Sequence, residues 1–402
     1  MIQDIIGLIL RPISYLIPVK KKHWVFGADY GNMYREGSKY LLEYMLKEHP
    51  DYNCTFITRN KDVIKELKNQ GIPVEHNYSW KGFLKIAEAD CVFTTQYITD
   101  LYFAYKKRNR HYYYLVHGQP FKIAAKMLKE KKEEIVRHQS VAKKIIYGIS
   151  RLRVWFMEYW GVGYKMRDVA FVSATSELTA SLMRKEFDAF VNVKILGMPR
   201  NDALFQSERM KNEYWIKGLE GKKIVTYMPT HRKYGKGKIS PIPFLYNEMV
   251  QDWLKDNNVV LLVKQHPNMV KNNENDMNSD VIKDISQLGY DPQVVIYHSD
   301  VLITDYSSVW MDYLLLRRPL IFYFYDDFEE EDAGCYYNLR DVFPNNYCES
   351  EESLFQMMKT AFSKGQRLIP SENIITKYHK YIDENSCHRY YKEIMKEVYG
   401  EK

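Results

Sequence analysis

The stretch VLITDYSSVWMDYLLLRRPLIFYFYD, residues 301–326, decides the fold class of this sequence. Its first three residues are apolar and, together with Thr304, predict a buried strand, which runs directly into the residues DYSS. Apolar residues then recur at helical spacing, and the run PLIFYFY at 319–325 predicts another strand. A strand, a helix and a second strand in this order form the unit from which parallel α/β sheets are built.

The same alternation of short apolar runs and helical patterns recurs along most of the 402 residues. A chain of this length is too long for one ordinary core and predicts two domains. The polar segment 204–222 loses the strand rhythm, so we place the junction there. The predicted strands are 23–28, 53–58, 90–95, 111–116, 169–174 and 193–197 before the junction, and 223–229, 259–267, 294–298, 301–306 and 319–325 after it.

We therefore predict an α/β protein with two doubly wound domains. Each domain would hold a parallel sheet, because helices separate the successive strands. The predicted parts are an amphipathic helix at 1–20, a first domain at 21–205 with an insertion at 122–168, a second domain at 206–372, and C-terminal helices at 373–402.

Polar side chains follow three strands of the predicted second domain, at the point where each strand ends. Ligands of open α/β sheets bind beyond the carboxyl ends of the strands, so these side chains predict one phosphate-binding site. Serines at the start of a helix add hydroxyl donors to its free N–H groups, although simple helix capping is the structural alternative. The residues are Thr230 and Arg232, then His266, then Ser307 and Ser308.

The segment LVHGQPFK at 115–122 places a histidine at a strand end in the first domain. The aromatic run before it stops at His117 and cannot continue as a regular strand through Pro120. This position presents His117 at the edge where α/β sheets keep their ligand crevices. An imidazole there suits either a catalytic base or a structural role.

Residues 1–17 carry apolar side chains at helical spacing, among them Ile6, Ile9 and Ile13, and predict an amphipathic helix. Pro12 interrupts the pattern, and its length is at or below what crosses a bilayer, so we predict no transmembrane helix. An acidic residue near the start and the lack of a small-residue cleavage site argue against a signal peptide. The helix either docks on its own domain or contacts a membrane surface.

Residues 122–153 hold ten Lys or Arg and three Glu, so this segment has the same net charge, +7, as the whole chain. The overlapping stretch 143–168 interleaves cations with aromatic residues, which suits the headgroup layer of an anionic bilayer. Single-stranded nucleic acid would also accept such a surface. Tryptophans that cluster with Ile and Val on a predicted helix favour lipid. The residues expected at the membrane are Arg151, Arg153, Trp155, Phe156 and Trp160.

The sequence lacks a Walker A motif and a G-x-G-x-x-G motif, and we expect no cofactor. Five widely spaced cysteines without a C-x-x-C pair indicate neither a disulfide framework nor a zinc site and suggest a reducing cytoplasm. The acidic run at 326–332 is more typical of a solvated loop than of a metal site, so we expect no essential metal.

With these residues in place, the sequence resembles the CDP-glycerol glycerophosphotransferase family, which builds the linkage unit and poly(glycerol phosphate) chains of wall teichoic acid. The resemblance covers most of the chain. His117 falls in the family's HG-T-P-L-K motif, which reads HGQPFK here and so departs from it at Gln119 and Phe121. The other motifs are WVFG at 24–27, GMPRND at 197–202, YMPTHR at 227–232, KQHP at 264–267 and SDVLITDYSSVWMDYLLLRRPLIFY at 299–323.

The resemblance implies a GT-B-like fold, in which two Rossmann-like domains face a cleft. It implies that CDP-glycerol is held mainly by the second domain and that an undecaprenyl-diphosphate-linked disaccharide enters from the first. His117 would be the general base, and His266 would contact the diphosphate as the second catalytic histidine. Donor contacts would come from Thr230, Arg232, His266, Asp305, Ser307 and Ser308, and acceptor contacts from Gly118, Gln119 and Lys122.

The implied reaction transfers glycerol phosphate to the lipid-linked acceptor and releases CMP at the cytoplasmic face of the bacterial membrane, where the protein would be peripheral. The compact length slightly favours the priming step over chain extension, and CDP-ribitol stays open as a donor. Two rival functions are a GT-B glycosyltransferase that uses a nucleotide sugar, and a non-enzymatic basic protein that binds membranes or nucleic acid.

Overall fold

The protein is described by a computed structural model, in which the chain forms two compact units. Unit 1 consists of residues 1–119, 124–202 and 383–402, and unit 2 consists of residues 120–123 and 203–382. The structure describes residues 2–96, 100–123, 133–134, 136–159, 166–187, 191–213, 218–230, 242–265, 279–326, 334–363 and 365–400.

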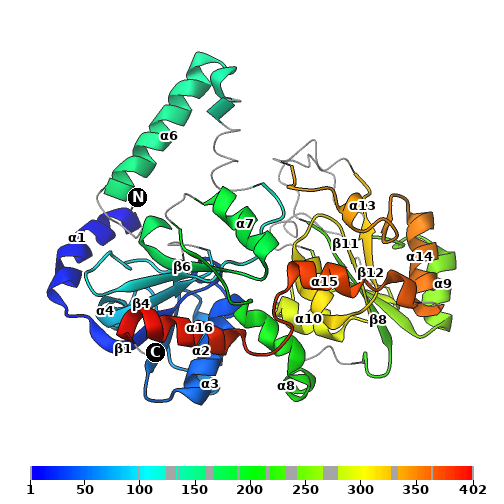
Figure 1. Ribbon diagram of the computed structural model, residues 1–402, viewed down its shortest axis with the longest axis horizontal. Helices are drawn as coiled ribbons and strands as arrows, with labels where there is room; N and C mark the ends of the chain where they lie inside the picture. The colour runs from blue at the N-terminus through cyan, green and yellow to red at the C-terminus, as the bar shows by residue number, and fades with distance from the viewer. Residues whose placement is uncertain are drawn as a thin grey trace. The chain divides into compact units, whose positions relative to one another are not determined.

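Unit 1 is built on a parallel sheet of seven strands among the described residues, in the order β3-β2-β1-β4-β5-β6-β7 (Figure 1). This order is typical of a doubly wound sheet, because the chain starts in the middle and builds outward in both directions. The strands are β1 (Lys20–Phe26), β2 (Asn53–Thr58), β3 (Val74–His76), β4 (Ala89–Thr94), β5 (His111–Tyr114), β6 (Val169–Ala174) and β7 (Val193–Ile195).

Aromatic rings from neighbouring strands stack across the sheet of unit 1. Phe26 and Phe93 stack with ring centroids 4.5 Å apart, and Phe93 and Tyr113 stack at 5.0 Å. Phe171 continues the row and meets Tyr390, from the C-terminal segment, at 5.6 Å. The last residues of the chain therefore complete the core of unit 1. The helices of unit 1 are α1 (Ile2–Leu16), α2 (Glu36–Glu48), α3 (Lys61–Asn69), α4 (Trp80–Glu88), α6 (Val141–Tyr159), α7 (Glu177–Glu186) and α16 (Ser386–Ile394), with the short 3-10 turn η1 (Asp29–Gly31). A second 3-10 turn, η4 (Pro199–Phe205), spans the boundary in sequence between the two units.

The N-terminal helix α1 docks on its own unit through one face. Gly7 and Ser14 are buried, and Leu10 packs into an apolar cluster beside Phe83 of α4. The Tyr105 hydroxyl donates a hydrogen bond to the carbonyl of Gly7 at 2.5 Å. The sequence left open whether this helix docks on its own domain, and the structure shows that it does. The docked face uses only part of the apolar surface of the helix.

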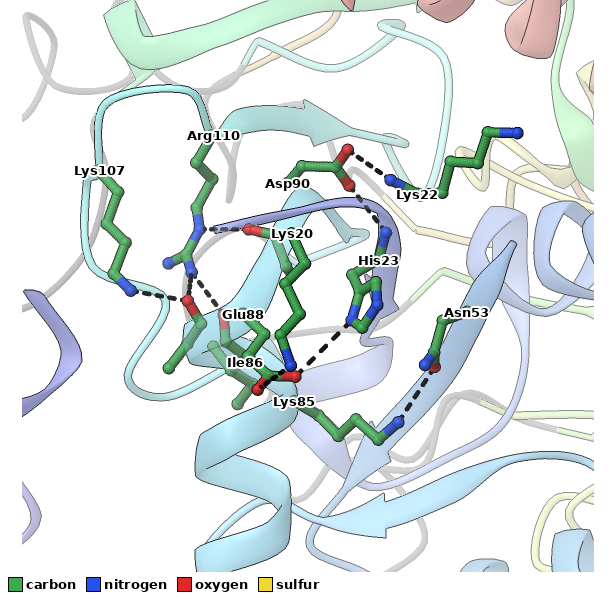
Figure 2. Close-up of polar contacts among 12 residues, drawn as sticks. Lys20, Lys22, His23, Asn53, Lys85, Ile86, Glu88, Asp90, Lys107 and Arg110 are labelled. Atoms are coloured by element: carbon green, nitrogen blue, oxygen red, sulfur yellow. Dashed lines mark hydrogen bonds and ion pairs between the residues drawn. The ribbon is translucent and has the colours of Figure 1, made fainter. Parts of the chain in front are cut away.

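Two buried cations hold the end of α4, as Figure 2 shows. Arg110 donates to the carbonyls of Ile86, Ala87 and Ala89 at 2.6, 2.7 and 2.9 Å. Lys107 also donates to the Ala87 carbonyl, at 2.7 Å. Cations suit the carbonyl end of a helix, where the backbone dipole is negative. Burial and the nearby Arg110 charge lower the pKa of Lys107 to about 8.

Unit 2 holds a second parallel sheet, with six strands among the described residues in the order β10-β9-β8-β11-β12-β13. Its strands are β8 (Lys223–Met228), β9 (Val259–Val263), β10 (Ile282–Asp284), β11 (Val301–Thr304), β12 (Leu320–Tyr323) and β13 (Tyr347–Cys348). Its helices are α8 (Ser207–Asn212), α9 (Glu248–Asp256), α10 (Pro292–His298), α11 (Val309–Tyr313), α13 (Leu339–Val342), α14 (Glu351–Ser363) and α15 (Glu372–Tyr378).

The predicted α/β class with parallel sheets is confirmed, but the predicted strand at 294–298 is wrong, because these residues form α10. The Asp291 side chain accepts a hydrogen bond from the N–H of Gln293, and Pro292 occupies the first turn. Both features start helices, and they outweigh the strand-like run VVIYH. In the part of the chain that the structure describes, no helix is both long and apolar enough to cross a membrane.

Candidate active site

The first half-site surrounds His117 in unit 1. The chain leaves β5 at Tyr114, and His117 follows at the carboxyl edge of the sheet, where its side chain is exposed. Its Nδ1 lies 3.4 Å from the carbonyl of Thr95, which follows the neighbouring strand β4. If Nδ1 carries the proton and donates it to this carbonyl, Nε2 is left as the basic nitrogen.

Charged side chains of unit 1 lie close to His117. Arg200 donates from Nη1 to the backbone carbonyl of His117 at 2.5 Å, and the same nitrogen forms an ion pair with Glu36. Protein surrounding the ring restricts its solvation although part of it is exposed, and this desolvation lowers the pKa of His117. Arg200 lowers it further, whereas Glu36 and Asp29 raise it. The ring is therefore favoured in its neutral form near pH 7 and can accept a proton.

The loop between β1 and α2 is fixed beside this half-site. The buried carboxylate of Asp100 accepts hydrogen bonds from the N–H groups of Thr95, Gln96 and Tyr30 at 2.6, 2.7 and 2.7 Å. Burial raises the pKa of Asp100 to about 6, although these hydrogen bonds oppose the shift. One side chain thus joins the end of β4 to the loop that follows β1.

The three predicted acceptor residues lie in different surroundings. Gly118 is half-buried, and Gln119 is buried with its amide engaged inside unit 1, where Oε1 accepts from the N–H of Thr175 at 3.2 Å. Lys122 belongs to unit 2, where its backbone bridges to Cys335. The Gln119 amide is therefore used to hold the end of β6, which its place in the motif did not indicate.

The second half-site lies at the strand ends of unit 2. The Asp305 carboxylate is fully buried after β11 and accepts the N–H of Thr230, which follows β8, at 2.7 Å. Ser307 and Ser308 are both half-buried. Among the described residues, the Ser308 hydroxyl makes no capping hydrogen bond to α11, so the capping alternative does not account for it.

Two residues of this half-site were missed by the sequence analysis. Gln265 follows β9 and is 2% exposed, and neither atom of its amide has a partner in the part of the chain described. Such a group can still bond a ligand. Arg340 lies 4.4 Å from the ring centroid of Phe324 and donates to the Tyr306 hydroxyl at 3.5 Å. Arg340 is 34 residues from Tyr306 of the DYSS motif in sequence, so only the contact in the folded unit reveals this cation.

Several predicted residues lie outside the described residues, namely Arg232, His266 and Trp160. Arg153, Trp155 and Phe156 belong to α6, which the structure describes only by its backbone at these positions.

Comparisons with known proteins match this chain over between half and nearly all of its length. The family model for CDP-glycerol:poly(glycerophosphate) glycerophosphotransferases matches residues 9–396. The teichoic acid glycerol-phosphate primase of Bacillus subtilis strain 168 is 31% identical over 54% of this chain and 55% of its own length. The teichoic acid poly(glycerol phosphate) polymerase of Bacillus spizizenii is 24% identical over 94% of this chain and 92% of its own length. The chain thus spans about half the length of the first of these relatives.

Solved structures show the same fold. The wall teichoic acid polymerase TagF matches with a TM-score of 0.75 at 21% identity, covering 99% of this chain and 97% of that one. A UDP-N-acetylglucosamine 2-epimerase from Listeria monocytogenes matches with a TM-score of 0.52 at 10% identity, covering 94% and 98%. These likenesses confirm the GT-B-like fold class expected from the sequence. The family model extends over most of both units, and the chain therefore belongs to the CDP-glycerol:poly(glycerophosphate) glycerophosphotransferase family.

Proposed function

We propose that this protein transfers glycerol phosphate from CDP-glycerol to a hydroxyl of an undecaprenyl-diphosphate-linked disaccharide in wall teichoic acid synthesis, and releases CMP. The observation that carries the proposal is the family match at 9–396, which includes the strand-end residues of both units. We favour priming over chain extension because two glycerol-phosphate primases are 31% and 32% identical to parts of this chain, whereas two poly(glycerol phosphate) polymerases are 24% and 23% identical over most of it. A poly(ribitol-phosphate) polymerase is also 32% identical over 42% of this chain, so the test below includes CDP-ribitol and counts the added units.

His117 is the general base of this proposal. The acceptor hydroxyl attacks the glycerol-bearing phosphorus in line, a new O–P bond forms, and the bond from phosphorus to the CMP oxygen breaks. The hydroxyl proton passes to Nε2 of His117, and CMP leaves with the bonding electrons. Support comes from the place of His117 at the carboxyl edge of the sheet and from the causes that keep its ring neutral.

The donor half-site is proposed for the strand ends of unit 2. Two features of the structure support it. The N–H of Thr230 donates a buried hydrogen bond to Asp305, which fixes two adjacent loops. Within the described residues, the Ser308 hydroxyl makes no capping hydrogen bond to α11. Such fixed polar groups can hold a diphosphate without reorganising during the reaction. By family resemblance we add Arg232 and His266, both cationic or N–H-donating, as partners of the phosphate oxygens.

Peripheral attachment to the cytoplasmic face of an anionic membrane completes the proposal. Beside the face of α1 that docks on unit 1, two apolar side chains form an exposed stripe: Ile9 is 61% exposed and Leu16 is 85% exposed. Figure 1 shows α6 extending away from the sheet of its unit. Ile145, Ile149 and Leu152 of α6 are 57%, 63% and 63% exposed. Exposed apolar stripes of this kind are costly in water and suit a headgroup layer, which supports attachment through both helices.

The test is a donor competition with the full chain. CDP-glycerol, CDP-ribitol and a UDP-sugar are each incubated with a synthetic undecaprenyl-diphosphate disaccharide analogue, and released CMP or UDP is measured together with product mass. We expect CMP release and one added glycerol phosphate with CDP-glycerol. Release of UDP alone would replace the proposal with a glycosyltransferase, and repeated addition would replace priming with polymerisation.

The same assay examines His117. His117→Ala should lower kcat at least about a hundredfold, in the range of general-base contributions, while calorimetry still detects CDP-glycerol binding. His388→Ala is the matched control, because His388 is an exposed histidine of unit 1 whose Nδ1 contacts the Tyr44 hydroxyl at 2.9 Å. Normal turnover by His117→Ala would remove the residue from the mechanism.

A further inference from the structure

The first turn of α2 starts in an unusual backbone conformation. Glu36 has a φ of 62°, in the left-handed region that favours glycine. Asp29 and Tyr30, in the same loop after β1, have φ values of 49° and 57°. Side-chain-bearing residues keep such conformations only when their surroundings hold them, and they gather at functional sites. The loop is therefore a place to look for residues that act on the neighbouring half-site.

Contacts on several sides hold this loop. The N–H of Tyr30 donates to Asp100 at 2.7 Å, and the N–H of Arg59 donates to the carbonyl of Gly31 at 2.8 Å. A Cβ placed on Gly37, next to Glu36, would lie 3.1 Å from the Cβ of Leu115. The start of α2 thus packs closely against the chain two residues before the predicted base.

Glu36 reaches the base through Arg200. Arg200 is 7% exposed, and its Nη1 contacts both the Glu36 carboxylate and the His117 carbonyl oxygen, the latter at 2.5 Å. One guanidinium nitrogen therefore connects two segments that are 164 and 83 residues away from it in sequence. A buried arginine that neutralises a carboxylate and also fixes a backbone carbonyl constrains the position of the attached side chain.

The two charges also have opposite effects on the imidazole. Glu36 raises the pKa of His117, Arg200 lowers it, and Asp29, on the same loop as Glu36, raises it. These are the charged groups of unit 1 that act most on the ring, in addition to desolvation, which is the largest cause and lowers the pKa. Removing one partner of the ion pair should therefore move the titration in one direction, and removing the other should move it in the opposite direction.

We propose that Glu36 and Arg200 are positioning residues for His117, which hold its backbone and balance the charge beside its ring, a role that rests on His117 acting as the base of the proposed reaction. The pair is not expected to touch the substrate. Its chemical function is to keep the imidazole at one location and in one protonation state while the acceptor hydroxyl approaches.

The test measures the imidazole directly. Full-length protein carrying ¹⁵N-labelled histidine rings is titrated by NMR, and the His117 signal is assigned from its loss in His117→Gln. We expect a lower pKa of His117 in Glu36→Gln and a higher pKa in Arg200→Gln, with Arg200→Lys returning toward the wild-type value. Glu36→Gly is a second charge-removing variant that suits the left-handed backbone and so guards against a folding failure.

Activity gives the second readout. The acidic limb of the pH profile of kcat/KM should move to lower pH in Glu36→Gln and to higher pH in Arg200→Gln, and kcat should fall about ten- to a hundredfold in both from misplacement of the base. Glu393→Gln is the control, because Glu393 is 22% exposed in a unit 1 ion pair with Lys194 at 2.8 Å. It should leave both the titration and the profile unchanged.

The outcomes separate the two proposals. Opposite shifts in the two variants support the positioning role. Shifts in the same direction, or none beyond those of Glu393→Gln, overturn it even if His117→Ala is inactive. If His117→Ala keeps normal turnover, the base assignment itself fails, while the NMR titration still reports whether the ion pair controls the ring.

Discussion

The carboxylate of Asp305 accepts the backbone N–H of Thr230 at 2.7 Å, and this bond joins the carboxyl ends of the adjacent parallel strands β8 and β11. At the opposite ends of the same strands, Asp300 accepts the N–H of Ile224 at the same distance, 2.7 Å. The two aspartates thus make the same kind of bridge at the two edges of one strand pair. Only the carboxyl edge is where α/β sheets bind ligands.

We therefore expect Asp305→Asn and Asp300→Asn to differ in donor binding. Each exchange weakens a charge-assisted hydrogen bond worth about 1.5–3 kcal/mol and should lower thermal stability. Asp305→Asn should in addition raise the dissociation constant of CDP-glycerol at least about tenfold, because the loops that carry Thr230 and Ser307 lose their connection. Calorimetric titration of CDP-glycerol into both variants checks this, and equal affinities would remove Asp305 from the donor site.

The exposed stripe of α1 gives a prediction about membranes. The double variant Ile9→Glu/Leu16→Glu should lower sedimentation with anionic vesicles about tenfold or more, because a buried apolar side chain contributes about 1.5–3 kcal/mol. The control is Tyr246→Glu/Met249→Glu in unit 2, where the same kind of side chain is 88% and 67% exposed. Equal loss in both variants would indicate a general charge effect, and no loss would show that α1 does not contact lipid.

How far the sequence predicts this structure depends on the distance over which each feature is determined. The strand 301–304 and the turn DYSS are determined by nearby residues, because the apolar run, the polar residues that end it and the helical spacing that follows all lie within one short stretch. The run at 294–298 is equally apolar but becomes helical, since Asp291 and Pro292 start a helix just before it. Local signals were therefore sufficient where capping residues were weighed, and misleading where they were not.

The candidate site shows the same limit. His117 could be predicted because a strand end fixes it locally. Glu36 and Arg200 could not, because the contact between them depends on how two segments 164 residues apart meet in the folded unit. Gln119 was expected at an acceptor surface, yet its amide holds Thr175 inside unit 1, a bond that no periodicity indicates. Motif matching singled out His117 and Gln119 alike and did not distinguish an exposed side chain from a buried one that holds a neighbouring strand end.

The close approach of Gly197 to the start of α16 gives a prediction about stability. Gly197 has a φ of +83°, and a Cβ there would lie 2.4 Å from the Ser386 hydroxyl, at the start of α16. Gly197→Ala should lower the free energy of unfolding by about 2–4 kcal/mol, from left-handed strain and overpacking together. Gly71→Ala is the control, because Gly71 has a φ of +73° with nothing within 4 Å, so it should lose only about 1–2 kcal/mol. Denaturant unfolding measures both, and equal losses would mean that the contact with Ser386 is unimportant.

The attachment of the same helix should depend on pH. Asp202 accepts the N–H groups of Ser386 and Cys387 at 2.9 and 2.8 Å, yet burial outweighs these bonds and raises its pKa to about 6, above the ordinary value of 3.8 for an aspartate. Between about pH 4 and pH 6 the folded protein therefore keeps a proton that the unfolded chain has lost. The free energy of unfolding should fall as pH rises through this window, by an amount on the order of 2–3 kcal/mol from Asp202. Asp202 is removed as a titrating group in Asp202→Asn, so the stability of this variant should change less with pH than that of wild type. Asp383→Asn is the control, because it removes a half-buried carboxylate from the same C-terminal segment and leaves Asp202 in place. An unchanged slope in Asp202→Asn would show that the carboxyl group is already ionised in the folded state at low pH, and that the two N–H bonds outweigh its burial.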